Sequence, residues 1–193
     1  GAGSRYTING LSFETSRIAA DVPIDIRAEF DFTSSNGVAG HAAIRNTTTV
    51  SESIAQITVD GLNIAGSLEG IVSGPTAFNF DARSVTIDTA AEHIDIGEVD
   101  FTILGISMSA DVEPFFYMDT PQLTALLRVA GFSLKELMQR LDMEFPATVD
   151  PAAMQSVSFI ANAVVGQDRI NLSAMSLELD DSTMTGTISL PMN

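Results

Sequence analysis

The sequence contains no cysteine and no tryptophan, and lysine occurs only once, at Lys135. Without cysteine there are no disulfides, thiolate metal sites or cysteine nucleophiles. No apolar run approaches the roughly 20 residues that a membrane-spanning helix needs. The 193 residues include 25 acidic and 9 basic ones, so the formal net charge is -16. Nucleic-acid-binding proteins and proteins drawn to anionic membranes carry basic patches, and this sequence has none.

Signatures of catalysis and of cofactor binding are also missing. The two histidines, His41 and His93, do not have the spacing of metal ligands. Glu92 and Asp95 flank His93, which leaves a metal or acid–base role open, but a surface histidine on a polar strand face is the favoured interpretation. There is no Gly-x-Ser-x-Gly elbow and no glycine-rich phosphate loop. We therefore predict a non-enzymatic protein without catalytic residues, metal or cofactor.

What the chain does contain is alternation of apolar and polar residues at period two, which is typical of strands with one buried face. In the clearest case, one face of a predicted strand carries Val22, Ile24, Ile26, Ala28, Phe30 and Phe32. Further strands are predicted at 6–13, 40–50, 57–64, 78–87, 94–103, 106–116 and from about 156 onward. Such closely spaced strands, with no helices between most of them, favour antiparallel meanders.

The hairpin predicted at 169–190 shows a slip in this alternation. Leu172 and Met175 are separated by two residues instead of one, and a β-bulge supplies such an extra residue. The same pattern recurs at 6–13, 57–64, 94–101 and 170–177, and with a longer insert at 78–87. Repeated bulges bend a sheet progressively, which predicts a curved trough. Chance repetition of a common irregularity is the alternative.

Helical signals are confined to residues 120–142. Thr120 and Pro121 resemble an N-cap followed by proline at the first helical position, and leucines follow at helical spacing up to Gly131. Ser133 and Glu136 form a capping box for a second helix. A further turn is predicted near 150–151.

Together these patterns predict a mainly β fold. We expect a curved, bulged antiparallel sheet that forms a trough or groove, with two or three short helices near 120–142 packed at it. We interpret residues 1–4 as a cloning remnant and 5–193 as a single β-rich domain from a longer protein. Within it, strands are expected at 5–118 and 156–191 and helices at 120–142.

The apolar content points to binding. Hydrophobic residues make up 45% of the chain and the mean hydropathy is +0.23, yet two short helices cover only part of an apolar sheet face. Either the sheet closes over itself as a sandwich, or part of the face stays open as a groove for acyl chains. The residues leave both alternatives open. For an open groove, the expected lipid-facing residues are Val22, Ile24, Ile26, Phe30, Phe32, Ile57, Val59, Phe78, Phe80, Ile106 and Met108.

The segment 132–190 resembles the C-terminal region of the AsmA family. The likeness is carried by the leucine-rich stretch around residues 131–137, by Asp-Pro-Ala at 150–152, and by the ending Leu179-Asp-Asp-Ser-Thr-Met-Thr-Gly186. Ser182 stands where the family pattern has threonine. The resemblance implies a periplasmic protein anchored to the inner membrane by a helix outside this sequence. It also implies a β trough that binds or conducts phospholipid and supports outer-membrane lipid homeostasis, without catalytic residues.

Two other functions remain as alternatives. A closed β-sandwich could serve as a structural or adhesive cell-surface module, Ca²⁺-dependent if Asp180 and Asp181 supplied ligands. These acids lack the spacing of known calcium loops, so a hairpin turn is the favoured interpretation. A hydrolase with paired carboxylates is the weakest alternative, because nothing selects one pair among 25 acids.

Overall fold

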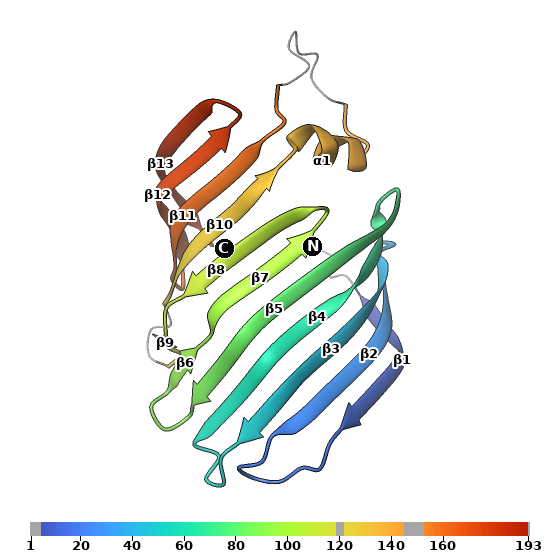
Figure 1. Cartoon of the computed structure of the whole chain (residues 1–193), viewed down its shortest axis with the longest axis vertical. Helices are drawn as coiled ribbons and strands as arrows, with labels where there is room; N and C mark the ends of the chain where they lie inside the picture. Colours follow the sequence, from blue (N-terminus) through green and yellow to red (C-terminus); the bar gives the residue numbers. More distant parts are fainter. Residues whose placement is uncertain (1–4, 119–121, 145–152, 193) are drawn as a thin grey trace.

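The computed structural model describes residues 5–118, 122–144 and 153–192, which form one large antiparallel sheet and one short helix (Figure 1). The helix α1 spans Leu134–Arg140. The strands are β1 (Tyr6–Thr15), β2 (Ile24–Ser34), β3 (Ala39–Val50), β4 (Gln56–Val72), β5 (Gly74–Asp88), β6 (His93–Asp95), β7 (Gly97–Ile103), β8 (Ile106–Val112), β9 (Phe115–Phe116), β10 (Leu123–Phe132), β11 (Val157–Val165), β12 (Arg169–Leu179) and β13 (Ser182–Pro191).

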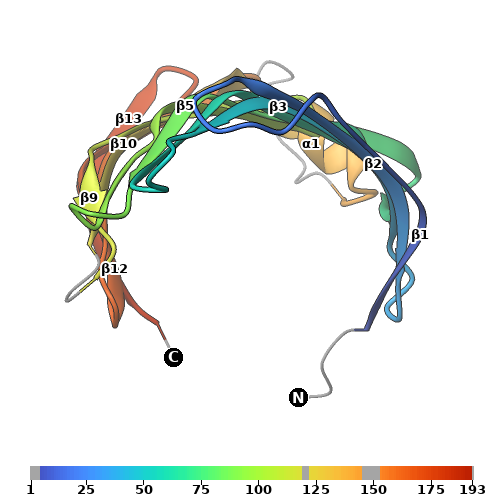
Figure 2. The ribbon, with the colours of Figure 1, turned by 90° about the horizontal axis from the view of Figure 1, so that it is seen from below.

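The strands follow one another across the sheet in the order β1-β2-β3-β4-β5-β7-β8-β10-β11-β12-β13. The short strands β6 and β9 pair with each other, and β6 also pairs with β5. Seen along the trough, the sheet is an arch with an open mouth, and β1 and β12 lie on opposite sides of that mouth (Figure 2). The edge strands β1 and β13 do not pair with each other.

The predicted mainly β, curved and bulged antiparallel sheet is thus confirmed. A closed sandwich needs two sheets that face each other, whereas the described residues form a single sheet that does not close on itself. The alternative of a closed sandwich was therefore wrong. Most connections between successive antiparallel strands are short, as in a meander, and the longest one, between β10 and β11, contains α1.

The first predicted helix was wrong. Residues 123–132 form strand β10, which pairs with β8 and with β11 over most of its length. The leucines of this segment fit helical spacing, but Leu123, Ala125, Leu127 and Val129 also alternate at period two. Pairing with a strand on each side outweighs a weak helical preference. The proposed cap at Thr120 and Pro121 and the turn near 150–151 lie outside the described residues.

The second predicted helix is α1, and its cap is confirmed. Ser133 is the N-cap residue, and its Oγ accepts a hydrogen bond from the backbone N–H of Glu136 at 3.2 Å. Only this one helix, rather than two or three, is present in the described part of the chain. The helical segment expected at 120–142 therefore shrinks to seven residues.

The predicted bulges are confirmed in three of the four repeats. Register shifts occur in β1 between Asn9 and Ser12, in β12 between Leu172 and Met175, and in β4 where it pairs with β3. Gly10 and Gly61 have φ values of 60° and Ala174 has 48°, the left-handed region that such bulges use. In the remaining repeat, Ile96 separates β6 from β7, and Gly97, the first residue of β7, has a φ of 68°. The chain is interrupted there rather than bulged within one strand.

Candidate functional site: the apolar face of the trough

One face of the sheet is apolar from edge to edge. Residues directly opposite in adjacent strands share a face, so the strand register traces a continuous row across eleven strands. This row is Phe13, Ala28, Ile44, Ile64, Phe80, Phe101, Met108, Val129, Phe159, Leu177 and Met184. Ten strand spacings of about 4.8 Å make the row about 48 Å long. We call the face that carries this row the trough face.

The trough face is the concave side of the sheet. Side chains on the concave side of a curved sheet converge, whereas those on the convex side spread apart. In β2 the trough-face residues are buried or half-buried and the intervening residues are exposed. All the buried residues among those described belong to the trough face, namely Ile24, Ala42, Thr76, Ala82, Ala125, Ala161 and Ala163. The arch in Figure 2 therefore encloses apolar side chains.

Bulges keep this face continuous. One extra residue in a regular strand would turn all later side chains to the opposite face of the sheet, and a bulge at that residue prevents this. In β4 the slip lies between Val59 and Leu62, and in β5 it lies between Ala82 and Val85. Val59 stands opposite Val85 and Leu62 opposite Ala82, so the two slips coincide and the register of this stretch is unbroken. Both halves of each strand therefore keep their apolar residues in the trough.

Glycines let aromatic rings lie against the sheet inside the trough. A Cβ placed on Gly40 would lie 2.8 Å from Phe32 Cζ, and one on Gly66 would lie 3.0 Å from Phe78 Cε1. The added Cβ would also lie 2.5 Å from the Ser67 carbonyl oxygen at Gly40 and 2.0 Å from the His41 carbonyl oxygen at Gly66, so a larger residue does not fit at either position. Rings that cover glycines in this way protect the strand backbone from water.

All but one of the predicted lipid-facing residues share the trough face. Ile24, Ile26, Phe30 and Phe32 do so on β2, Ile57 and Val59 on β4, Phe78 and Phe80 on β5, and Ile106 and Met108 on β8. The placement of Val22 was wrong, because β2 begins only at Ile24 and Val22 is 46% exposed in the preceding turn. The sequence prediction also missed Val129, Phe159 and Leu177. The helix expected at 120–130 concealed the period-two alternation that would have revealed Val129.

A few polar residues interrupt the trough face near one end of the strands. Thr15 and Asn46 flank Ile26 from the two neighbouring strands, and Thr48 lies opposite Ile24. The Thr48 hydroxyl donates to Asn46 Oδ1 at 2.8 Å, so these two half-buried side chains partly satisfy each other. The rest of the face offers acyl chains a nearly uniform apolar surface.

The helix α1 lies at one end of the trough, next to the end of β10 and the turns of neighbouring hairpins (Figure 1). Arg140 Nη1 donates to the carbonyl of Leu104, in the β7–β8 turn, at 2.9 Å. Beyond the helix, the Ser73 hydroxyl in the β4–β5 turn donates to Asp142 Oδ2 at 3.1 Å. Two polar contacts thus hold the helical segment against the end of the sheet.

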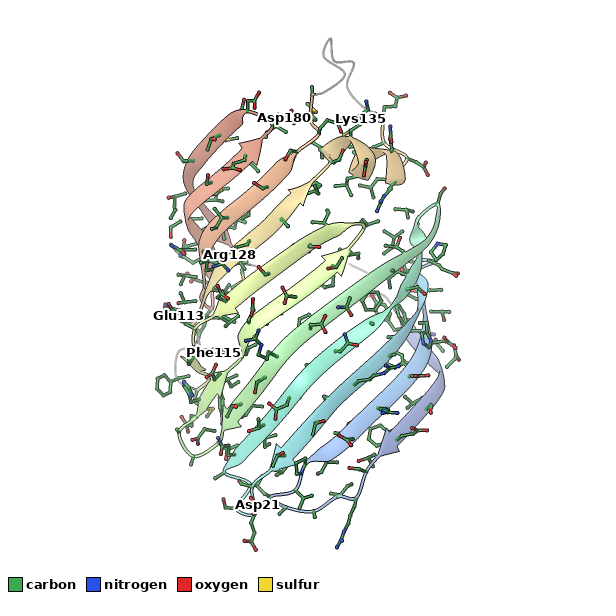
Figure 3. The ribbon with its side chains drawn as sticks, viewed as in Figure 1. Asp21, Glu113, Phe115, Arg128, Lys135 and Asp180 are labelled. Atoms are coloured by element: carbon green, nitrogen blue, oxygen red, sulfur yellow. The ribbon has the colours of Figure 1, made fainter. Side chains whose placement is uncertain are left out.

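Asp180 anchors the C-terminal hairpin and is not arranged as a calcium ligand. Its carboxylate accepts hydrogen bonds from the backbone N–H groups of Met154, Gln155 and Ser156, at 2.5, 2.9 and 3.0 Å. Asp180 and α1 lie at the same end of the sheet (Figure 3). With φ at 50°, Asp180 also makes the turn between β12 and β13, so the favoured hairpin-turn prediction is confirmed.

The opposite, convex face is polar and tied together by cross-strand hydrogen bonds. Asn63 Nδ2 donates to Asn79 Oδ1 and to Asp81 Oδ1, both at 2.8 Å. On this face His41 Nδ1 lies 3.0 Å from Asp31 Oδ1. The rings of His93 and Phe116 also lie on this face and meet edge to face, with their centroids 5.4 Å apart. The described residues contain no group of three or more histidine or acidic side chains that could hold a metal. The favoured surface interpretation of both histidines fits these positions.

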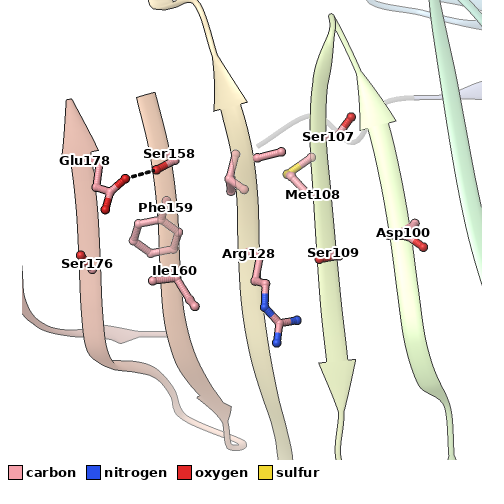
Figure 4. Close-up of a pocket in the computed structure, with 12 residues that line it drawn as sticks. Asp100, Ser107, Met108, Ser109, Arg128, Ser158, Phe159, Ile160, Ser176 and Glu178 are labelled. Atoms are coloured by element: carbon pink, nitrogen blue, oxygen red, sulfur yellow. Dashed lines mark hydrogen bonds between the residues drawn. The ribbon is translucent and has the colours of Figure 1, made fainter. Parts of the chain in front are cut away.

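A shallow depression of about 440 Å³ lies on this polar side between β7 and β12 (Figure 4). Arg128 lies near its centre and is already paired with Asp111 at 2.6 Å, while Glu178 accepts a hydrogen bond from Ser158 at 3.1 Å. Because the charged groups of Arg128 and Glu178 already interact with neighbours, the depression is a weaker candidate site than the trough face.

Comparison with known proteins yields no relative. No family model, no curated protein and no solved structure matches the chain. Among the described residues, none of the helical structure has the length and apolar character needed to span a membrane. The geometry of the chain itself therefore carries the functional argument.

Proposed function

We propose that this chain is a lipid-binding segment that holds or conducts phospholipid along its trough face. The observation that carries the proposal is the uninterrupted apolar row across eleven strands of an open arch. No second sheet among the described residues covers it. Exposed apolar surface on this scale is rare on soluble proteins unless something binds there.

The physical basis of binding is the transfer of acyl chains from water to the trough face. Each buried methylene contributes about 0.8 kcal/mol, so the two acyl chains of a phospholipid together provide the favourable free energy of association. The open mouth leaves the polar headgroup in water, which avoids the cost of burying a charge. Movement along the trough needs no nucleophile and no cofactor, consistent with a non-enzymatic role.

The resemblance to the AsmA family supports a cellular context for this activity. We propose a periplasmic location, with an inner-membrane anchor elsewhere in the full-length protein and a role in outer-membrane lipid homeostasis. The β12–β13 hairpin, whose Asp180-Asp181 turn is part of the likeness, forms one edge of the sheet.

The proposal is tested with Phe30→Asp on the trough face of β2 and Thr33→Asp on the polar face of the same strand. A carboxylate among acyl chains is strongly unfavourable. We expect Phe30→Asp to reduce co-purifying phospholipid, measured by native mass spectrometry, at least tenfold, and Thr33→Asp to leave it unchanged. Circular dichroism must first show that both variants are folded. Wild-type protein without lipid, or a folded Phe30→Asp variant with full lipid content, would overturn the proposal.

A further inference from the structure

Strand β1 forms one edge of the described sheet. β1 pairs only with β2 among the described strands. The carbonyl of Arg5 accepts from Ser35 N at 2.9 Å, and Ser16 N donates to the Asp25 carbonyl at 3.0 Å. Because bonding alternates along an antiparallel pair, these two bonds identify the β1 residues whose backbone groups point away from β2. They are Tyr6 and Ile8 before the bulge and Phe13 and Thr15 after it.

This edge is also apolar and unprotected. On the trough face of β1, Tyr6, Ile8, Leu11 and Phe13 are 64%, 60%, 66% and 62% exposed. Edge strands are usually blocked by lysine, proline or a bulge. β1 has no lysine and no proline, and its bulge between Asn9 and Ser12 blocks only partner strands that lack a matching bulge.

The pattern of β1 is its own mirror image. Its apolar residues are Tyr6, Ile8, Leu11 and Phe13. One residue separates the members of each outer pair and two residues separate Ile8 from Leu11, so the spacing is the same in both directions. Two such patterns pair antiparallel within this structure, where β4 and β5 place apolar residues opposite one another and their slips coincide. The opposed pairs are Ile57 with Ile87, Val59 with Val85, Leu62 with Ala82, and Ile64 with Phe80.

We propose that β1 pairs antiparallel with β1 of a second copy of this chain. Matching the two slips sets Tyr6 opposite the partner subunit's Phe13 and Ile8 opposite the partner subunit's Leu11. In the same register Glu14 faces the partner subunit's Arg5, so opposite charges meet at both ends of the interface. In this register Tyr6 and the partner subunit's Phe13 both point their backbone groups across the interface, so they can exchange hydrogen bonds in both copies.

The register singles out this partner strand over the other free edge. On β13 the trough-face residues Met184, Gly186, Ile188 and Leu190 alternate without a slip, so the bulge of β1 would have no counterpart there. A two-fold axis perpendicular to the sheet closes the dimer and puts both trough faces on the same side. This association does not depend on lipid binding and can occur with or without it.

The first test is sedimentation of the whole chain over a range of concentrations. We expect the mass to rise from 20.4 kDa toward twice that value. Leu11→Lys should weaken the dimer at least tenfold, and it replaces an exposed side chain, so the fold is retained. The matched control is Met184→Lys on the other edge strand, where the side chain is 58% exposed. A monomer up to about 1 mM, or a dimer sensitive to Met184→Lys alone, overturns the proposal.

The second test fixes the register. Arg5→Glu or Glu14→Arg alone should weaken the dimer severalfold, and the double exchange should restore it. Because the chain has no cysteine, Thr7→Cys mixed with Ser12→Cys should form a disulfide between copies, since these residues face each other at short range in the proposed register. Thr7→Cys mixed with Thr183→Cys should not. Cross-linking of the second mixture but not the first would overturn the β1–β1 pairing.

Discussion

A single carboxylate ties together two segments that are far apart in the chain. Asp180 turns the C-terminal hairpin and accepts three backbone hydrogen bonds from residues 154–156. The hydrogen bond from Ser156, followed by that from Met154, holds the pKa of the Asp180 carboxyl below its ordinary value. The charged form is therefore the one that the folded state favours.

This preference predicts a pH-dependent effect of Asp180→Ala. With a lowered folded-state pKa, the contribution of Asp180 to stability is complete above its ordinary pKa and is lost as pH falls through the lowered one. We expect Asp180→Ala to lower the Tm by a few degrees at pH 7 and the difference from wild type to shrink toward pH 2. Thermal melts followed by circular dichroism measure it, with Asp181→Ala as control. A difference that is constant with pH would contradict the assignment.

Residue-level predictions succeeded where local chemistry decides the structure. The Ser133 cap and the bulges in β1, β4 and β12 depend on a few neighbouring residues, so the sequence was sufficient to predict them. Val22 was misplaced because alternation continues through residues that precede the strand, and the sequence does not mark where pairing with β1 and β3 begins. Ala174 shows that a left-handed bulge position does not always carry glycine.

At the scale of elements, β10 and α1 show which information the sequence lacks. Both segments carry leucines at helical spacing. Residues 134–140 also have a serine cap and no strand partner, and they form a helix, whereas residues 123–132 lie between β8 and β11. Nonlocal pairing therefore decided the outcome, and it is not visible in a local pattern. The sheet itself was predictable because alternation repeats in almost every strand.

The short helix depends on its attachment to the sheet. Seven residues are too few for a stable isolated helix in water, and the Arg140 side chain provides one of the polar contacts that hold this segment against the sheet. We expect Arg140→Ala to speed amide hydrogen exchange in α1 at least fivefold while the overall Tm changes by less than about 3 °C. Hydrogen exchange followed by mass spectrometry measures the exchange rates of the amides in the helix and in the sheet.

The matched control is Arg83→Ala, which removes an exposed arginine paired with Glu98 at 3.2 Å on the polar face. It should leave exchange in α1 unchanged. Equal exchange in wild type and Arg140→Ala would show that the hydrogen bond to the Leu104 carbonyl does not hold the helix.

At the scale of the whole molecule, the open arch brings together residues from every part of the chain. The sequence predicted most of the trough face in the N-terminal half, and the arrangement of strands supplied the rest. An apolar side chain in the middle of the row is therefore expected to matter for movement along the trough more than one near an edge. Phe101 occupies such a position, between Phe80 and Met108.

We predict that Phe101→Asp slows lipid transfer between donor and acceptor vesicles at least tenfold while some bound lipid remains. A carboxylate at this point raises the free energy of any acyl chain that passes it, but the apolar surface on either side is intact. Fluorescent-lipid transfer and native mass spectrometry measure the two quantities separately. Thr102→Asp, which adds the same charge to the polar face one residue away, should change neither. Equal transfer rates for the two variants would mean that lipid does not travel along the row.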